Sequence, residues 1–270
     1  MTLRLAPAPA MADYLERAFG SAQSPSLDGS GPIRCGVDLG TATIVLAIVD
    51  EAQEPVYCDA VPSQAVRDGV VGDFHGAAES VAHLKERAET VLGITLEEAA
   101  TAYPPGVGAN ESRACQFVLE RAGLECRELI DEVSAANALL GVRDGVVVDV
   151  GGGSTGVGII RGGMLIDVGD LPGGGHHLNL ILAGALGIGI EEAERLKRED
   201  GGTRGNGGAH HSRYLHILRP GLERVAANIE RLSRGAKDLP VHLVGGALMI
   251  RGAGDVIAQY LDRPVVEYPH

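Results

Sequence analysis

An aspartate followed by glycines and hydroxyl residues is the stretch of this sequence that could do chemistry. It comprises Asp149, Gly151, Gly152, Gly153, Ser154 and Thr155. Apolar, β-favouring residues precede and follow it between positions 146 and 160, which predicts a β-hairpin with a tight turn. Glycine lets successive backbone N–H groups converge on an anion, and hydroxyls add donors, so the turn suits phosphate. An ordinary glycine-rich hairpin is the alternative.

A second copy of this pattern occurs near the N-terminus. It consists of Asp38, Gly40, Thr41 and Thr43, followed by an apolar run from 44 to 49. Two such hairpins predict two similar halves that offer phosphate-binding turns from opposite sides, with both aspartates facing one cleft. Because two carboxylates repel a polyphosphate, their presence favours a hydrated Mg²⁺ between the acids and the phosphates.

Composition limits the classes of partner. The chain has 270 residues, 45% hydrophobic and 3% aromatic, with a formal net charge of −13. Such a length allows two domains with cores of Val, Ile, Leu and Ala. The negative charge disfavours nucleic acid or an anionic membrane as main partner. No apolar stretch of about 18 residues and no signal-peptide pattern occurs, so we expect a cytoplasmic protein.

The cysteine and histidine residues give little support for a bound metal. None of Cys35, Cys58, Cys115 and Cys126 forms a C-x-x-C pair, which favours reduced thiols. Two adjacent histidine pairs, at 176–177 and 210–211, are better explained as solvated loop residues than as ligands.

The elements that position the two turns follow from the hydrophobic pattern. Predicted helices cover 11–20, 77–92, 110–122 with Asn110 as its cap, 133–140, 176–186, 190–198, 214–232 and 254–261. Strands are expected at both hairpins, before Tyr103, at 165–168 and at 241–244, and a glycine-rich loop at 200–212. This order predicts α/β layers, in which ligands lie at the carboxyl ends of strands. A disordered tail is the alternative for the first helix.

Four motifs occur in order along nearly the whole chain. They are Asp38-Leu-Gly-Thr, Glu132 before an Ala-rich helix, Asp149-Val-Gly-Gly-Gly and Leu243-Val-Gly-Gly. Together they resemble the actin, heat-shock-70 and hexokinase ATPase superfamily. The stretch from Tyr103-Pro-Pro to Ile130-Asp-Glu-Val-Ser-Ala-Ala resembles its chaperone branch. The compact build is most similar to the ethanolamine-utilisation protein J family, whose members accompany bacterial microcompartments.

The resemblance implies a fold of two ribonuclease H-like domains around a nucleotide. It divides the chain into an amphipathic helix with a flexible linker at 1–31, domain I at 32–145, domain II at 146–257 and a truncated segment at 258–270. The helix that normally returns to domain I is missing from this pattern. Domain I is therefore expected to expose an apolar groove, which favours self-association or weakened domain closure.

The resemblance also assigns roles to residues. The two hairpins hold phosphates and Mg²⁺ through Asp38, Gly40, Thr41 and Thr43, and through Asp149, Gly151, Gly152, Gly153 and Ser154. Contacts with the rest of the nucleotide fall to Gly174, Gly175, Glu194, Lys197, Gly245 and Gly246. Glu132 orients the attacking water, because phosphoryl transfer needs an oriented nucleophile more than a strong base. A purely capping role for Glu132 is the alternative.

Two further departures from the chaperone pattern stand out. Met249 replaces an arginine that packs on the adenine, which puts the affinity for the base in doubt. No lysine occurs between Cys35 and Lys85, so the helper lysine of the chaperones has no equivalent, and Arg67 is the nearest cation.

Three functions are compatible with these observations. The first is a slowly hydrolysing, MgATP-binding chaperone-like protein or assembly factor, with microcompartment shell proteins or an ethanolamine ammonia-lyase as partners. The second is a nucleotide-dependent scaffold or filament protein. The third, a sugar or acid kinase, lacks an additional substrate motif. In the first reading the N-terminal helix docks on a shell protein.

Overall fold

The chain folds into two compact units. The computed structural model describes residues 4–5, 9–25, 31–67, 70–202 and 211–268. Of these, unit 1 comprises 4–5 and the residues from 136 onward, and unit 2 comprises the residues from 9 to 135. The chain therefore passes between the units after β1 and again within α4, Glu132–Leu140.

Unit 2 is built on a mixed five-stranded sheet. Its strand order is β4-β3-β2-β7-β8, with bounds β2 Arg34–Leu39, β3 Thr43–Val49, β4 Pro55–Pro62, β7 Glu98–Tyr103 and β8 Glu125–Asp131. The first three strands are antiparallel neighbours, whereas β2, β7 and β8 run parallel. Along β3 the buried residues Ile44, Leu46 and Ile48 alternate with more exposed ones, as a sheet packed on one face requires.

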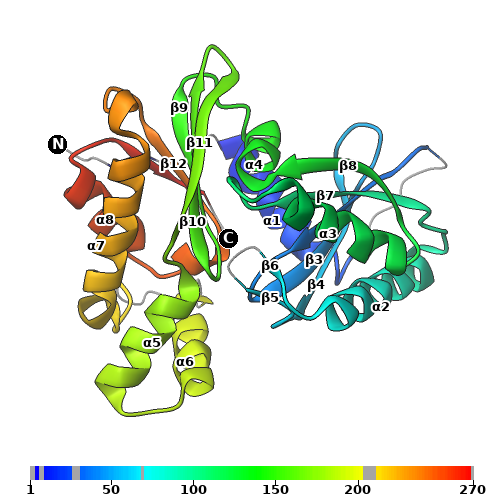
Figure 1. Ribbon diagram of the computed structural model, residues 1–270, viewed down its shortest axis with the longest axis horizontal. Coiled ribbons are helices and arrows are strands. Elements are labelled where there is room, and N and C mark those ends of the chain that lie inside the picture. Colours follow the sequence, from blue (N-terminus) through cyan, green and yellow to red (C-terminus); the bar gives the residue numbers. More distant parts are fainter. Residues whose placement is uncertain (1–3, 6–8, 26–30, 68–69, 203–210, 269–270) are drawn as a thin grey trace. The chain divides into compact units, whose positions relative to one another are not determined.

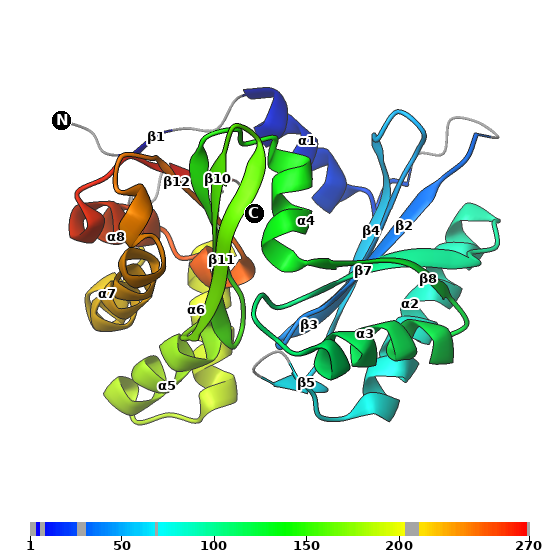
Figure 2. The same ribbon diagram turned by 45° about the horizontal axis from the view of Figure 1, so that its top comes forward.

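Helices cover this sheet. The helices α2, Phe74–Leu92, and α3, Ala109–Arg121, pack together and against its strands, while α1, Pro9–Gly20, packs along β4 on the other side (Figure 2). The Asp73 side chain caps α2 by accepting from the Gly76 N–H, and Gly93 in left-handed conformation ends it. A small ribbon joins β5, Val66–Arg67, to β6, Val70–Val71.

The predicted cap of α3 is wrong. Asn110 lies inside the helix, and Gly108 is the N-cap residue without a side-chain hydrogen bond. Within the helix, Phe117 is 51% exposed, whereas Val118 and Leu119 are fully buried. Only two of three consecutive positions on a helix can face the core, because each residue turns the chain by about 100°.

Unit 1 is built on a six-stranded sheet of order β1-β13-β12-β9-β10-β11. The bounds are β1 Arg4–Leu5, β9 Gly145–Val150, β10 Ser154–Arg161, β11 Met164–Pro172, β12 Val241–Val244 and β13 Val265–Glu267. The strands β9, β10 and β11 form antiparallel pairs, and the rest are parallel. Residues 258–270 thus supply the end of a helix and a sheet strand, since β13 pairs with both β12 and β1. A bulge between Ile159 and Ile160 shifts the register of the β10–β11 pair at the sheet edge.

Helices also pack against the sheet of unit 1. Their bounds are α5 Gly175–Leu186, α6 Ile190–Gly202, α7 Leu215–Leu232 and α8 Ala253–Leu261, with short 3-10 helices Arg234–Ala236 and Gly246–Leu248. Helices α7 and α8 lie side by side against the sheet (Figure 1). Most of the predicted loop at 200–212 lies outside the described residues, and Asp200, still in α6, accepts a hydrogen bond from the Ser212 hydroxyl.

The described part of the chain contains four free cysteines, and none of its helices has the length and apolar character to cross a membrane. The predicted N-terminal helix is present as α1, so this stretch is not a disordered tail.

We predict that Arg263 stabilises unit 1. Its buried guanidinium donates to the Ser233 hydroxyl at 2.9 Å and to the carbonyls of Ala236 and Leu239, both at 2.7 Å. Arg263→Met leaves these acceptors without donors and should lower the free energy of unfolding by about 2 to 3 kcal/mol. Urea denaturation followed by circular dichroism measures this change. Arg224→Met, at an exposed position on α7, should have little effect.

Candidate functional site

The turn between β9 and β10 is held by its carbonyl groups. The carbonyl of Gly151 accepts from the Gly175 N–H at 3.0 Å, that of Gly152 from the His176 N–H at 2.8 Å, and that of Gly153 from the Gly173 N–H at 3.0 Å. The donors belong to the chain entering α5 and to the first turn of that helix, whose N–H groups have no partner within the helix. The start of α5 is therefore used to anchor the turn.

The same bonds decide what the turn can bind. With three successive carbonyls occupied, the turn offers a ligand its N–H groups, and in the described part of the chain no hydrogen bond reaches those of Gly152 and Gly153. Neighbouring backbone N–H groups in a glycine turn form a concave, partly positive surface that binds anions. A phosphate would bind at the N–H groups of Gly152 and Gly153, and this role stays a prediction.

Glycine is required where backbone segments meet beneath this turn. A Cβ atom on Gly174 would overlap the Gly151 carbonyl oxygen and lie 3.0 Å from the Gly152 carbonyl. Gly245 has a φ of 100°, and a Cβ there would overlap a carboxylate oxygen of Asp149. This contact follows from the parallel pairing of Val244 with Asp149 in β12 and β9. The structure thus brings Asp149, the turn and Gly245 together within unit 1.

Thr155, one of the hydroxyl residues of the predicted turn, has a positioning role. Its side chain is fully buried, and its hydroxyl donates to the Gly173 carbonyl at 2.6 Å. This bond ties the first residues of β10 to the chain entering α5, in addition to the three backbone bonds. A buried hydroxyl has to find a partner, but the partner lies 18 residues away and local sequence does not reveal it.

Lys197 approaches the same part of unit 1 from α6. Its ammonium group donates to the Gly175 carbonyl at 3.2 Å, and a Cβ on Gly175 would lie 3.4 Å from it. Burial lowers the pKa of Lys197 to about 8, while the Glu194 carboxylate opposes this shift. A cation beside the anion-binding turn can add attraction for phosphate or for a hydroxyl of a ligand.

The remaining predicted site residues of unit 1 lie on α6 and around the 3-10 helix Gly246–Leu248. Glu194 accepts from Arg198 along α6, at 2.9 Å from Nε, so contact of Glu194 with a ligand stays a prediction. Gly246 begins the 3-10 helix after Gly245, with open space around its Cα. Met249 follows that helix and is 43% exposed.

The turn between β2 and β3 repeats the arrangement in unit 2. The Ala42 carbonyl accepts from the Ser63 N–H at 3.1 Å, and no hydrogen bond within the described residues reaches the N–H groups of Thr41 and Ala42. A Cβ on Gly40 would lie 2.6 Å from the Thr43 carbonyl oxygen and 3.4 Å from the Asp38 carboxylate. Asp38, Gly40 and Thr43 therefore lie together at one tight turn, as the sequence predicts.

The charges of Asp38 and Glu132 act on one thiol of unit 2. Burial, followed by the charges of Glu132 and Asp38, raises the pKa of the Cys115 thiol to about 11, so both carboxylates lie within electrostatic reach of that thiol. Loss of hydration raises the pKa of Asp38 to about 6. The residue is nevertheless exposed to solvent, which limits that rise, so the carboxylate is charged at neutral pH.

Asp131, and not Glu132, caps α4. The Asp131 carboxylate accepts from the Ser134 N–H at 2.9 Å, three residues ahead, as an N-cap side chain does. Asp131 therefore occupies the N-cap position of α4, and the water-orienting role of Glu132 stays a prediction. The sequence contains the signal for this cap, because an aspartate precedes the predicted helix 133–140 by the usual N-cap spacing.

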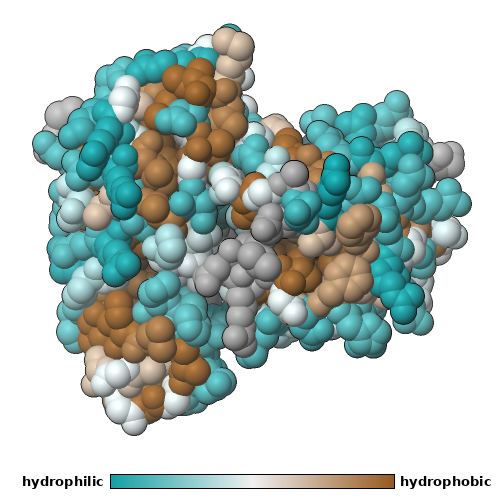
Figure 3. All heavy atoms as spheres, viewed as in Figure 1, coloured by the Kyte–Doolittle hydropathy of each residue, from teal (hydrophilic) through white to brown (hydrophobic). Residues whose placement is uncertain are grey.

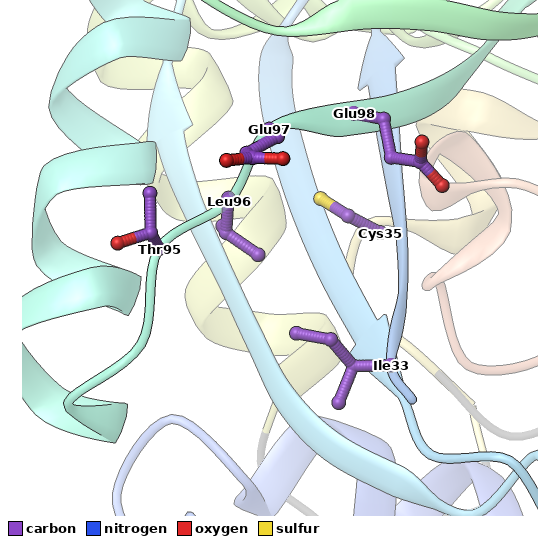
Figure 4. Close-up of a pocket in the computed structure, with 6 residues that line it drawn as sticks. All are labelled: Ile33, Cys35, Thr95, Leu96, Glu97 and Glu98. Carbon is purple, nitrogen blue, oxygen red and sulfur yellow. The ribbon is translucent and has the colours of Figure 1, made fainter. Parts of the chain in front are cut away.

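One cavity lies away from both turns. A space of about 190 Å³ in unit 2 is lined by Ile33, Cys35, Thr95, Leu96, Glu97 and Glu98 (Figure 4). It adjoins the start of β2, whereas the β2–β3 turn follows the end of that strand. Burial raises the pKa of the Cys35 thiol to about 12, so the thiol stays protonated and is a poor nucleophile or metal ligand. The cavity is therefore not the candidate site.

No residue cluster of unit 1 or unit 2, within the described ranges, could hold a metal ion by itself through three or more His, Cys, Asp or Glu side chains. A Mg²⁺ ion bound mainly by water and phosphate needs only one or two protein carboxylates. The side chain of Arg67 lies outside the described part, and Lys85 pairs with Glu89 within α2 at 2.8 Å.

The chain is similar to known proteins over most of its length. The family model for MreB/Mbl protein matches residues 45–206, and that for cell division protein FtsA matches residues 146–268. The crystal structure of MreB5 of Spiroplasma citri bound to ADP superposes with a TM-score of 0.66 at 18% identity, covering 88% of this chain and 92% of that one. This last likeness concerns the fold alone.

The relatives of higher identity are ethanolamine utilization proteins. EutJ of Salmonella typhimurium is 34% identical over 247 residues, which cover 92% of this chain and 84% of that protein, and EutJ of Escherichia coli matches over the same length at the same identity. The crystal structure of EutJ from Carboxydothermus hydrogenoformans superposes with a TM-score of 0.88 at 35% identity, covering 96% of this chain and 93% of that one. The chain therefore belongs to the EutJ family of ethanolamine utilization proteins and has the actin-like ATPase fold.

Proposed function

We propose that this protein binds MgATP through its two glycine turns. The observation that carries the proposal is the way the Gly151–Gly153 turn is held. Its carbonyls are bonded to residues around the start of α5, and within the described residues no hydrogen bond reaches the N–H groups of Gly152 and Gly153, which can bind an anion. The turn at Thr41 and Ala42 has the same character. The nucleotide named in the MreB5 structure is further support, since that protein shares the fold.

The acids at the two turns support magnesium. Asp38 and Asp149 are each the last residue but one of a β-strand that leads into a turn. A carboxylate beside a phosphate-binding turn repels the ligand unless a cation lies between them, and Mg²⁺ keeps several of its water molecules in such sites. Asp38 and Asp149 would hold the hydrated ion, which neutralises charge on the phosphates when bound.

We propose further that hydrolysis is slow and depends on Glu132. Glu132 is the first residue of α4, the helix that Asp131 caps, and its charge acts on the same thiol as that of Asp38. A fixed carboxylate can accept a hydrogen bond from water and orient it for attack on phosphorus. No lysine on β2, β3 or β4 offers additional charge there, consistent with a low rate.

The relatives support a role in ethanolamine utilization. We assign the protein the function of a nucleotide-dependent, chaperone-like assembly factor in the cytoplasm, with shell or ammonia-lyase proteins of a microcompartment as clients. The support is the name shared by the EutJ relatives. The prediction that α1 docks on a shell protein is weakened, because α1 packs along β4 of its own unit.

An apolar strip on β11 favours a second candidate, a nucleotide-dependent scaffold. β11 is the last strand in its sheet among the described strands. Met164, Ile166 and Val168 are 68%, 55% and 37% exposed along it. Figure 3 shows further apolar surface over α5, where Leu180 and Leu186 are exposed. Such patches promote association. Pelleting by sedimentation only with MgATP would favour the scaffold.

Gly174, the N-cap residue of α5, and Gly184, within α5, provide the test of the predicted anion-binding turn. Gly174→Ala forces a methyl group into the Gly151 carbonyl, so the turn has to shift, and we expect ATP affinity to fall at least tenfold. Gly184→Ala adds the same methyl group to open space on the same helix and should keep affinity unchanged. Isothermal titration calorimetry compares the two variants. Equal affinities would remove the turn from the site.

We expect the magnesium dependence of ATP binding to require the Asp149 carboxylate. Asp149→Asn removes the charge that anchors the hydrated ion, and should lower MgATP affinity about 10- to 100-fold. Binding of ATP in excess EDTA should change far less. Asp167→Asn, which removes an exposed charge on β11, controls for the change in net charge. An equal loss with and without magnesium would contradict the role in metal binding.

We expect a substitution of Glu132 to lower the rate of ATP hydrolysis and to leave ATP binding intact. We expect Glu132→Gln to keep ATP affinity within about twofold and to lower phosphate release by about 10²- to 10⁴-fold, because the water loses its acceptor. Glu128→Gln, on the exposed side of β8, should retain full turnover. Unchanged turnover in the Glu132 variant would show that another group orients the water.

The buried Lys197 predicts a pH dependence. Its pKa of about 8 lies below the ordinary lysine value, so the ammonium form predominates below pH 8 and is lost above it. An anion binds the charged form, and ATP affinity should therefore fall about tenfold between pH 7 and pH 9. Lys197→Met should bind more weakly at pH 7 and show a flat profile. A wild-type affinity that does not change over this range would exclude Lys197 from the site.

A further inference from the structure

The helix α7 buries one side and exposes the other. Its buried residues Leu218, Leu222, Val225 and Ile229 recur at helical spacing and pack on the core of unit 1. Each residue of a helix turns the chain by about 100°, so the residues opposite this stripe are those at 220, 224, 227 and 231. The side chains at these positions decide what α7 presents to solvent.

Arginines dominate the outer side of α7. Arg224 and Arg231 lie two turns apart on it, and Arg234 follows in the 3-10 helix after α7; all three residues are exposed. Ala227 lies half-buried between Arg224 and Arg231, where its small side chain allows another helix to approach closely. Together, Arg224, Ala227, Arg231 and Arg234 form what we call the basic face.

The three arginines of the basic face have no acidic partner within the described ranges. The neighbouring acids of the same segment are all paired with other cations, in the ion pairs Arg219–Glu223 at 3.3 Å, Lys237–Glu230 at 3.4 Å and Arg161–Asp238 at 2.9 Å. No side-chain hydrogen bond or ion pair joins another described residue to any of the three arginines. Their charges are therefore left for a partner.

Two general explanations account for this cluster only in part. A cation in the last turn of a helix complements its dipole, which explains Arg231 but not Arg224, two turns earlier. Random placement of surface charge favours acids, since the whole chain has 23 Lys and Arg against 36 Asp and Glu. Between 211 and 238 this balance is reversed, with six basic residues against three acidic ones. The basic face thus differs from the rest of the chain in the charge that it presents.

We propose that the basic face is a docking surface for an acidic helical segment of a partner protein. Arginine forms two parallel hydrogen bonds with one carboxylate, so three unpaired guanidinium groups match three Asp or Glu side chains. The arginines are seven and three residues apart, and acids with this spacing lie on one side of a helix. Nucleic acid fits less well, because the net charge of −13 repels its long row of phosphates. Docking of this kind requires no nucleotide and is separate from the MgATP site.

A titration with designed peptides tests this docking surface on the full chain. The matched probe is a helical alanine–glutamine peptide whose three glutamates have the spacing of the arginines. The second probe has the same composition, with its glutamates scattered around the helix. Without nucleotide and at low salt, we expect the matched peptide to bind about fivefold more tightly and to shift the Nε–H NMR signals of the three arginines. Added salt should weaken this binding, because it screens exposed charges.

Two triple variants with the same change in net charge locate the binding. Arg224→Gln, Arg231→Gln and Arg234→Gln together should weaken binding of the matched peptide about fivefold, since three exposed ion pairs are lost. The control changes exposed arginines on α3, β8 and α6 and should keep the affinity within about twofold; its substitutions are Arg121→Gln, Arg127→Gln and Arg195→Gln. Circular dichroism checks that both variants keep their fold.

Three results would overturn the proposal. They are equal affinity for the two peptides, equal losses in the two triple variants, and a short RNA that binds the basic face more tightly than the matched peptide does. Because no nucleotide is present in these titrations, their outcome is independent of the proposed MgATP binding.

Discussion

The hydrogen bonds between the Gly151–Gly153 carbonyls and the residues around the start of α5 are the interaction on which the rest of unit 1 depends. They satisfy helix N–H groups that have no internal partner. Within the described residues they also leave the N–H groups of Gly152 and Gly153 without a hydrogen bond, so an anion can bind there. Gly174 and Thr155 are explained by these bonds: one lets the backbones approach, and the other reinforces the contact. Anchoring and binding thus use opposite ends of the same peptide groups.

The acidic groups follow from where strands end. Asp38 and Asp149 occupy equivalent places on the central hairpins of their units, each directly before a turn. Glu132 comes after a third strand end, at the beginning of a helix whose cap is its neighbour Asp131. Carboxyl ends of strands and starts of helices gather polar backbone groups, which is why ligand sites in α/β folds lie there. The two units repeat this solution, although few of their other residues correspond.

Much of the fold could be predicted from sequence because its signals are local. The glycine and hydroxyl runs showed both hairpins, and the helical periodicity of 77–92 and 214–232 showed two long helices. The hydrogen-bond partner of a buried hydroxyl such as that of Thr155 lies far along the chain, so local sequence does not reveal this bond. The pattern of α1 showed that it had to bury a face, but not that the β3–β4 turn would receive it. Asn110 is a residue type that favours the N-cap position, but Gly108 occupies that position in α3.

The bulge between Ile159 and Ile160 bears on the solubility of the molecule. A long, regular border strand is a template on which identical chains can stack into fibrils. The bulge twists β11 away from that regular shape, and Asp167 and Pro172 interrupt the row of groups that another chain would have to match. The apolar residues of β11 can therefore meet a partner through their side chains, in a complex of limited size, while growth of an endless sheet is blocked.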